Sequence, residues 1–139
     1  MNEQSYWTQR RLECMERVLI VDDYRAAAAA TAECLSLHGL QTRVAGGCAE
    51  ALEIVHFWRP DMVLLDLMMP QRDGFSTARA IRGNPKSTTT FICAYTSKDG
   101  EFVARSREGA LFDGYFRKGA SPDRLLSFLR CSCVSHELE

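Results

Sequence analysis

Short apolar runs, each the length of one β-strand, recur along this chain and limit the folds open to it. Four such runs occupy residues 18–21, 62–65, 91–94 and 114–116, and a more polar run at 42–45 is a fifth candidate strand. The apolar runs do not alternate with polar residues. This pattern indicates strands that are covered on both faces, as in a parallel sheet.

Sequence with helical character separates these strands, over residues 24–38, 48–58, 75–82, 99–109 and 122–133. Gly39 follows the first segment, where a left-handed C-cap would lie, and Pro60 lies just beyond the second. Regular alternation of strand and helix predicts an α/β fold with right-handed crossovers. We expect a flavodoxin-like, doubly wound sheet of five parallel strands in the order 2-1-3-4-5, flanked by five helices, with the polar strand at an edge.

The length and composition of the chain suit a single domain. Its 139 residues are 46% hydrophobic and 25% charged, which is ordinary for a globular protein. We expect residues 18–131 to form the domain, preceded by an N-terminal extension over 1–17 and followed by a C-terminal tail over 132–139.

Charge and cysteine content exclude several classes of function. The 17 basic and 18 acidic side chains nearly cancel, so we expect no direct binding to nucleic acid. No apolar stretch approaches the roughly 20 residues of a membrane-spanning helix, which argues against membrane insertion. The 6 cysteines are dispersed and not densely spaced, so we expect reduced thiols and a cytoplasmic location.

Chemically active residues follow four of the candidate strands. Asp22 and Asp23 come after the first, Asp66 after the third, Thr96 after the fourth and Lys118 after the fifth. Because parallel strands carry equivalent ends to the same edge of a sheet, these side chains are expected to converge in one crevice.

Three carboxylates in one crevice repel each other and require a cation. Oxygen ligands favour Mg²⁺, with Mn²⁺ as a possible substitute, and Mg²⁺ bound by a few carboxylates is typical of phosphoryl-transfer sites. An aspartate can be the nucleophile of such a transfer. Lys118 would supply positive charge to phosphate oxygens, and the hydroxyl of Thr96 a hydrogen bond.

Four sequence motifs together carry a family resemblance. They are the acidic pair after residues 18–21, the segment from Asp66 to Gly74, the segment 94–97 and the segment 115–118. From about residue 18 to residue 130 the chain resembles a bacterial receiver domain of the response regulators of two-component signalling, in its single-domain form.

The resemblance implies a role for each acidic residue. Asp66 would be the phosphoacceptor, and it would hold the metal together with Asp22 and Asp23. Met68 would add its backbone carbonyl as a further metal ligand.

The resemblance also implies how the site responds to phosphate. Thr96 and Lys118 would bind the phosphoryl oxygens, and Thr96 and Tyr115 would form the switch, with the ring turning inward as the threonine moves. Gly119 follows Lys118 where receivers usually have a proline in a cis peptide, so the backbone that directs Lys118 is expected to differ from the family.

The implied function is a signalling switch, not a turnover enzyme. A sensor histidine kinase or a histidine phosphotransfer protein would phosphorylate Asp66 in a Mg²⁺-dependent reaction, and the domain would promote its own phosphorylation and dephosphorylation. No output domain follows the last helix, so output is expected through a downstream protein partner. Homodimerisation could use the face formed by residues 99–109, 114–116 and 122–133.

Two other functions remain open on sequence grounds. One is a receiver-like scaffold that binds partners without being phosphorylated. The other is a phosphatase with an aspartate nucleophile, of the haloacid-dehalogenase type, but such enzymes need an aspartate as general acid two residues on, where this chain has Met68.

Structural readings also compete at single residues. Tyr115 could fill the gap beneath the last helix, and Asp73 and Gly74 are best read as the turn and cap that start the third helix. Met68, which is larger and more apolar than the polar residue common at its position, is hypothesised to slow hydrolysis of an aspartyl-phosphate by excluding water.

Overall fold

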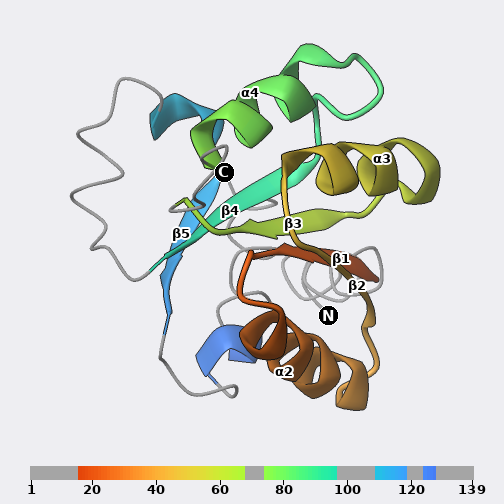
Figure 1. Cartoon of the computed structure of the whole chain (residues 1–139), viewed down its shortest axis with the longest axis vertical. Coiled ribbons are helices and arrows are strands. Elements are labelled where there is room, and N and C mark those ends of the chain that lie inside the picture. The colour runs from red at the N-terminus through yellow and green to blue at the C-terminus, as the bar shows by residue number, and fades with distance from the viewer. Residues whose placement is uncertain (1–15, 68–73, 97–108, 119–123, 128–139) are drawn as a thin grey trace, which may run out of the picture.

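The structure, a computed structural model, describes residues 16–67, 74–96, 109–118 and 124–127. Its centre is one sheet of five parallel strands in the order β2-β1-β3-β4-β5 (Figure 1). The strands are β1 Arg17–Val21, β2 Gln41–Ala45, β3 Met62–Leu65, β4 Phe91–Thr96 and β5 Gly114–Arg117. The predicted strand order and the predicted edge position of the polar strand are both confirmed.

Three α-helices connect the strands within the described ranges. They are α2 Arg25–Leu37, α3 Cys48–Trp58 and α4 Gly74–Gly83, and a short 3₁₀ helix, η1 Gly109–Leu111, precedes β5. Most of the fourth expected helix, 99–109, lies outside the described residues, and of the fifth only the helical residues 124–127 are described. The described parts therefore agree with the doubly wound fold.

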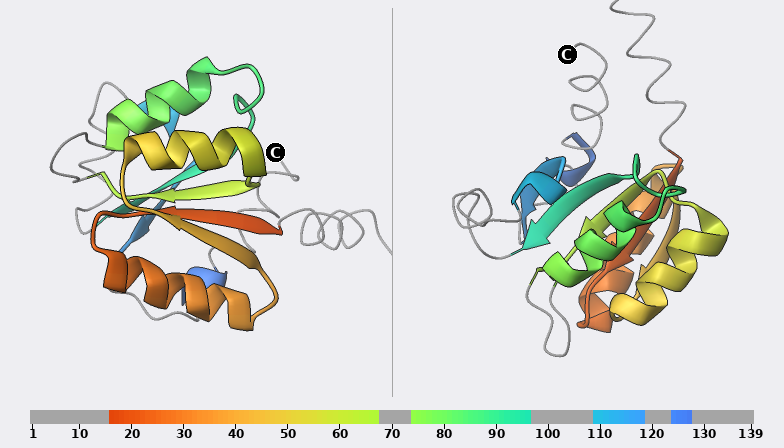
Figure 2. Two further views of the ribbon diagram at one scale, coloured as in Figure 1. Left: turned by 45° about the vertical axis from the view of Figure 1, so that its right-hand side comes forward. Right: turned by 90° about the horizontal axis from the view of Figure 1, so that it is seen from above.

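The helices form one layer on each face of the sheet (Figure 2). α2 and residues 124–127 cover one face, while α3 and α4 cover the other. Side chains of each strand alternate between these layers. In β1, Val18 and Ile20 pack toward α2, whereas Leu19 and Val21 pack toward α3. The continuous apolar strands of the sequence follow from this burial on both faces.

Two features predicted from composition can be checked in the described residues. None of the helices there is both long and apolar enough to cross a membrane. Cys34, Cys48 and Cys93 form no disulfide bond, and the other cysteines lie outside the described ranges.

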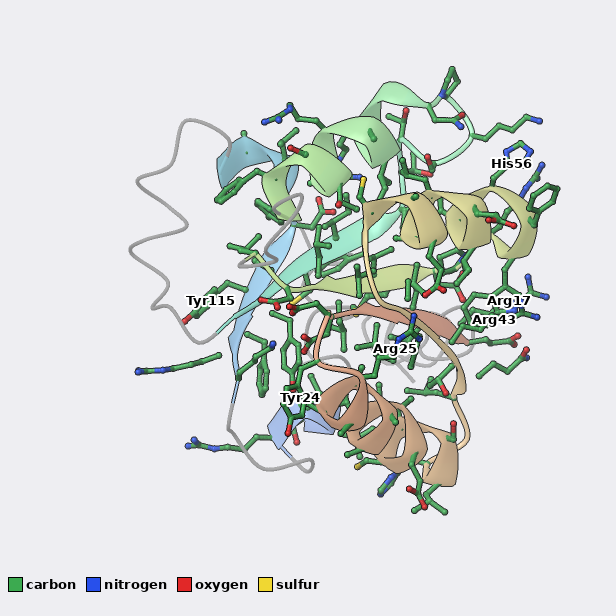
Figure 3. The ribbon with its side chains drawn as sticks, viewed as in Figure 1. Arg17, Tyr24, Arg25, Arg43, His56 and Tyr115 are labelled. Atoms are coloured by element: carbon green, nitrogen blue, oxygen red, sulfur yellow. The ribbon has the colours of Figure 1, made fainter. Side chains whose placement is uncertain are left out.

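Polar contacts hold together the edge of the sheet where the strands begin. The Asp61 carboxylate accepts hydrogen bonds from the backbone N–H groups of Glu16 and Arg17, at 2.8 and 2.9 Å. The guanidinium groups of Arg17 and Arg43 lie 5.8 and 5.1 Å from the Trp58 ring, and Figure 3 shows both arginines on the side of the molecule opposite Tyr115. These contacts tie β1, β2 and the end of α3 together.

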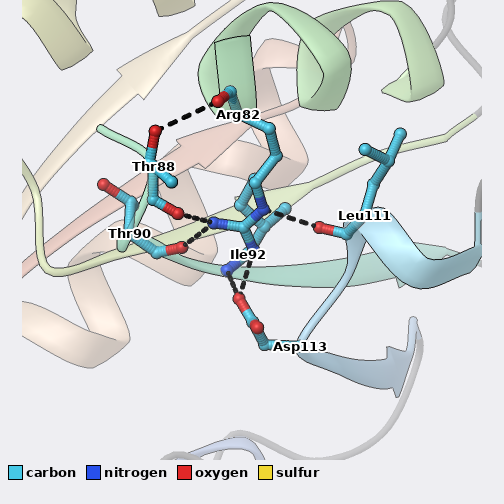
Figure 4. A network of polar contacts seen from close by, with 6 residues as sticks. All are labelled: Arg82, Thr88, Thr90, Ile92, Leu111 and Asp113. Carbon is cyan, nitrogen blue, oxygen red and sulfur yellow. Dashed lines mark hydrogen bonds and ion pairs between the residues drawn. The ribbon is translucent and has the colours of Figure 1, made fainter. Parts of the chain in front are cut away.

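Arg82 makes the largest of these networks (Figure 4). Its guanidinium donates to the carbonyl oxygens of Thr90, Thr88 and Leu111, at 2.6, 2.8 and 3.1 Å, and it forms a short ion pair with Asp113. The same Asp113 oxygen accepts the backbone N–H of Ile92 at 2.9 Å. One side chain thus joins the end of α4 to the starts of β4 and β5.

We predict that Arg82→Gln lowers the free energy of unfolding by about 2–3 kcal/mol, because it removes charge-assisted hydrogen bonds to three carbonyls and leaves Asp113 without its cation. Urea denaturation of the two proteins measures the difference. Lys86→Gln removes an equal charge from an exposed position nearby and should change stability by less than about 0.5 kcal/mol. Equal losses in the two variants would contradict this prediction.

Candidate functional site

The register of β1 against β3 sets two aspartates side by side. Val21 pairs with Leu65, so Asp22 and Asp66 occupy equivalent positions just beyond their strands. The N–H of Asp66 donates to the Val21 carbonyl at 2.9 Å, and the N–H of Asp22 to the Ala45 carbonyl at 3.0 Å. These bonds extend the sheet ladder by one residue, which fixes both aspartates to the frame of the sheet.

Three carboxylates form a cluster at this edge. Asp22 and Asp66 are 1% and 5% exposed, while Asp23 is exposed, and one oxygen from each lies within 4.8 Å of the others. The Oδ1 atom of Asp22 also accepts the N–H of Tyr24 at 3.0 Å, which orients the carboxylate at the start of α2. The sequence-based prediction that these three residues converge agrees with this geometry.

Lys118 places a positive charge against the cluster. Its Nζ donates to Oδ2 of Asp22 at 2.6 Å and lies 3.4 Å from Oδ2 of Asp66. Burial works against the charge on this side chain, but the hydrogen bond to Asp22 and the attraction of both carboxylates outweigh it and raise the pKa of Lys118 above its ordinary value. The ammonium group is therefore charged at neutral pH.

The charge balance of the cluster fits a divalent cation. Among the described residues, these three carboxylates face the ammonium group of Lys118, which leaves an excess of negative charge that is costly where two of the carboxylates are buried. Mg²⁺ is held by oxygen ligands, commonly one or two carboxylates together with water. Asp22, Asp23 and Asp66 offer such donors, one oxygen from each within 4.8 Å of the others, and would hold the ion.

Gly74 allows the backbone after β3 to come close to α4. It is buried at the first position of the helix, and its N–H donates to the Leu67 carbonyl at 3.2 Å. A Cβ atom built on Gly74 would lie 2.8 Å from the Leu67 Cα and closer still to the Asp66 carbonyl oxygen. The sequence reading of this residue as a helix start was correct but incomplete, since the absence of a side chain also sets the position of Asp66.

The remaining predicted site residues are placed in part. Thr96 ends β4 in register with Arg117, so its backbone lies at the same edge as the carboxylates. Its side chain and the whole of Met68 lie outside the described residues. Their roles stay predictions.

Tyr115 lies on the face of the sheet opposite residues 124–127, the described part of the last helix. It packs against Leu67 and Ala94 with Phe75, whereas Phe116, the next residue of β5, packs in the cluster that contains Leu125 and Leu126. The alternative reading of Tyr115 as the residue that fills that gap is therefore wrong, because adjacent strand residues face opposite sides of the sheet.

Comparison with known proteins decides the family. The profile of the response regulator receiver domain matches residues 18–130. The chain belongs to this receiver domain family. Response regulators MprA of Mycobacterium tuberculosis (strain ATCC 25618 / H37Rv) and of Mycobacterium ulcerans (strain Agy99) are 33% and 32% identical to it over 114 and 123 residues. These matches cover 82% and 88% of the chain but 49% and 52% of the relatives, so the receiver domain spans about half of their length.

Solved structures show the same architecture. The chemotaxis protein CheY4 of Vibrio cholerae is similar with a TM-score of 0.78 and 28% identity, covering 85% of this chain and 98% of CheY4. A CheY-like response regulator receiver domain from Methylobacillus flagellatus has a TM-score of 0.74 and 27% identity, with the same coverage. The five-stranded sheet is thus the receiver fold.

A second contact at the site was not predicted from sequence. The Nζ atom of Lys118 lies 5.7 Å from the centroid of the Tyr95 ring, and that ring stacks on Phe116 with an interplanar angle of 17°. The sequence pattern did indicate that Tyr95, Phe116 and Lys118 lie on the same face of the sheet, because β4 and β5 are neighbours and every second residue of a strand faces the same side. The contact itself depends on the register, which pairs Tyr95 with Phe116.

We predict that Gly74→Ala destabilises the domain by about 1–3 kcal/mol, because the new methyl group must displace the backbone of Asp66 and Leu67. Gly83→Ala is the matched control. It lies in the same helix with nothing near its added Cβ, and it should be neutral or up to about 1 kcal/mol more stable. Thermal unfolding of both variants tests this, and a Gly74→Ala protein as stable as Gly83→Ala would disprove the close approach.

Proposed function

We propose that this receiver domain accepts a phosphoryl group on Asp66 in a Mg²⁺-dependent reaction and signals through protein partners. The observation that carries the proposal is the environment of the Asp66 carboxylate. It is buried beside Asp22 and Asp23, within 3.4 Å of the Lys118 ammonium group, at the carboxyl edge of a parallel sheet.

These residues divide the chemistry of the transfer among them. A carboxylate oxygen of Asp66 attacks phosphorus, the bond from phosphorus to the donor nitrogen breaks, and an acyl phosphate forms on Asp66. Lys118 would bind a phosphoryl oxygen, which its 3.4 Å distance from the Asp66 carboxylate supports, and Thr96 at the end of β4 would make a second such contact. Asp22 and Asp23 would hold a Mg²⁺ or Mn²⁺ ion, which supplies neutralising charge to the transferred group.

The proposed donor is a sensor histidine kinase or a histidine phosphotransfer protein in the cytoplasm, and the proposed output is binding to a downstream protein. The relatives are named response regulators, which supports this assignment. Switching is assigned to Thr96 and to Tyr115 on β5. Homodimerisation through β5, residues 99–109 and the last helix belongs to the same proposal.

We predict that acetyl phosphate or phosphoramidate with Mg²⁺ adds about 80 Da to the intact protein, the mass of one phosphoryl group. Asp66→Asn should abolish the adduct, because the amide is not a nucleophile at this position, and removal of Mg²⁺ with a chelator should greatly reduce it. Intact-mass spectrometry measures all three. Glu53→Gln removes an exposed carboxylate from α3 and should leave the adduct unchanged.

The two other functions give different results in the same experiment. A folded protein that never gains the adduct would support a scaffold that acts without phosphorylation. Continuous release of phosphate from the donor, with no adduct and with dependence on Asp66, would instead support a phosphatase.

We further propose that Met68 prolongs the life of the phosphorylated state by excluding water from the acyl phosphate. Met68→Asn should then shorten the dephosphorylation half-life several-fold, measured as loss of the adduct after the donor is removed. Met69→Asn, the same change one position along, is the control. An unchanged or longer half-life in Met68→Asn would refute the role of Met68.

A further inference from the structure

We propose that Tyr95 is a positioning residue for Lys118, holding the ammonium group over the face of its ring at the edge of the carboxylate cluster. The proposal rests on the function assigned above, since it concerns how the lysine reaches phosphoryl oxygens. It gives a role to the residue immediately before Thr96.

The geometry places the ring and both carboxylates around one ammonium group. Nζ of Lys118 lies 5.7 Å from the centroid of the Tyr95 ring, 2.6 Å from Asp22 and 3.4 Å from Asp66. Distances below about 6 Å from a ring face are those of cation–π attraction. The lysine is thus bounded by charge on one side and by an aromatic face on another.

Strand alternation explains why these groups share one face of the sheet. Tyr95 and Phe116 pack against the core layer beneath α2, and the register pairs them across β4 and β5. Lys118 follows Phe116 by two residues, and Asp66 follows Leu64 of the same layer by two. If the alternation continues past the strand ends, Lys118 and Asp66 lie on the same side of the sheet as Tyr95 and Phe116, the side covered by α2.

The core fixes the position of the ring. Tyr95 stacks on Phe116 with centroids 6.1 Å apart, and both aromatic residues pack against a buried cluster that includes Leu125 and Leu126. These contacts limit how far the half-buried ring can move, because the core it packs against is closely packed. The ring therefore offers Lys118 a surface held on one side by the core.

Lys118 needs such a surface for two reasons. Its ammonium group lies closer to Asp22 than to Asp66, so the carboxylates alone draw it toward the acidic pair and away from the proposed phosphoacceptor. In addition, Gly119 follows it, so the backbone lacks the fixed φ angle of the proline usual in receivers. Attraction to the ring does not depend on which carboxylate is charged, and it limits the positions open to the long, flexible side chain.

A first experiment tests the contact itself in protein free of metal and phosphate. The chain has only three lysines, Lys86, Lys98 and Lys118, so their ε-methylene signals can be assigned by NMR. The signal of Lys118 should be shifted upfield by the ring current of Tyr95. Tyr95→Phe should keep the shift, and Tyr95→Leu should remove it. A Lys118 signal that does not move between these variants would overturn the proposal.

A second experiment tests the consequence for phosphorylation. Tyr95→Leu should slow adduct formation from phosphoramidate roughly three- to tenfold, and Tyr95→Phe should remain near the wild-type rate. Trp58→Leu is the matched control, because it removes a ring that also lies near cations, Arg17 and Arg43, but at the other edge of the sheet. Comparable slowing in Trp58→Leu would mean that general loss of packing is the cause, and would overturn the role of Tyr95.

A mutant cycle separates action through Lys118 from other effects of the ring. In the background of Lys118→Ala, Tyr95→Leu should cause no further slowing, because coupled residues are not additive. Equal slowing in both backgrounds would overturn the proposal. Where Tyr95→Leu does not fold, fluorinated phenylalanines at position 95 weaken the ring's attraction for cations while keeping its shape, and the rate should fall with each added fluorine.

The two proposals fail in different ways. A wild-type protein that gains no adduct, yet shows the ring-current shift on Lys118, would remove the proposed phosphorylation and leave the contact with Tyr95 established. An adduct on Asp66 without the ring-current shift would support the proposed phosphorylation and overturn the contact between Lys118 and Tyr95.

Discussion

Two buried carboxylates held side by side, with one lysine as counter-charge, form the interaction on which this site depends. Asp22 and Asp66 are adjacent because β1 and β3 pair in register, and their repulsion is relieved by Lys118, which is 96 residues from Asp22 in sequence. The hydrogen bond between Lys118 and Asp22 forms only when the sheet is assembled from β1 to β5. Assembly of the sheet therefore also assembles this part of the site, and the residual negative charge is what a bound cation would neutralise.

Charged side chains have different roles at the two edges of the sheet. Where the strands begin, Asp61 and Arg82 bond to backbone groups of several elements, so charge is used to join them. Where the strands end, three carboxylates face Lys118, and within the described part of the chain negative charge is in excess there. The uncompensated charge at the second edge is in keeping with the tendency of functional sites to depart from the most stable arrangement.

The fold and the centre of the site could be predicted because they follow from local patterns. Unbroken apolar runs predicted the strands, and Asp22, Asp66 and Lys118 were predicted as site residues because they follow those runs. Gly74 and Tyr95 could not be understood in the same way, since the first depends on how closely α4 approaches the backbone after β3, and the second on the register between β4 and β5. Periodicity assigns a residue to a face, but it does not say which neighbour it meets there.

Under the proposed function, Lys118 would link the chemistry of the site to β5. It follows β5 directly, and the two residues before it, Phe116 and Arg117, are a core aromatic residue and an exposed cation. Phosphorylation of Asp66 would replace one carboxylate charge with phosphoryl oxygens farther from the backbone, so the best position for the ammonium group would move outward. Because the Tyr95 ring packs against the core, the proposed contact would guide that movement along the face of the ring, and β5, which Lys118 follows, would be the element that responds.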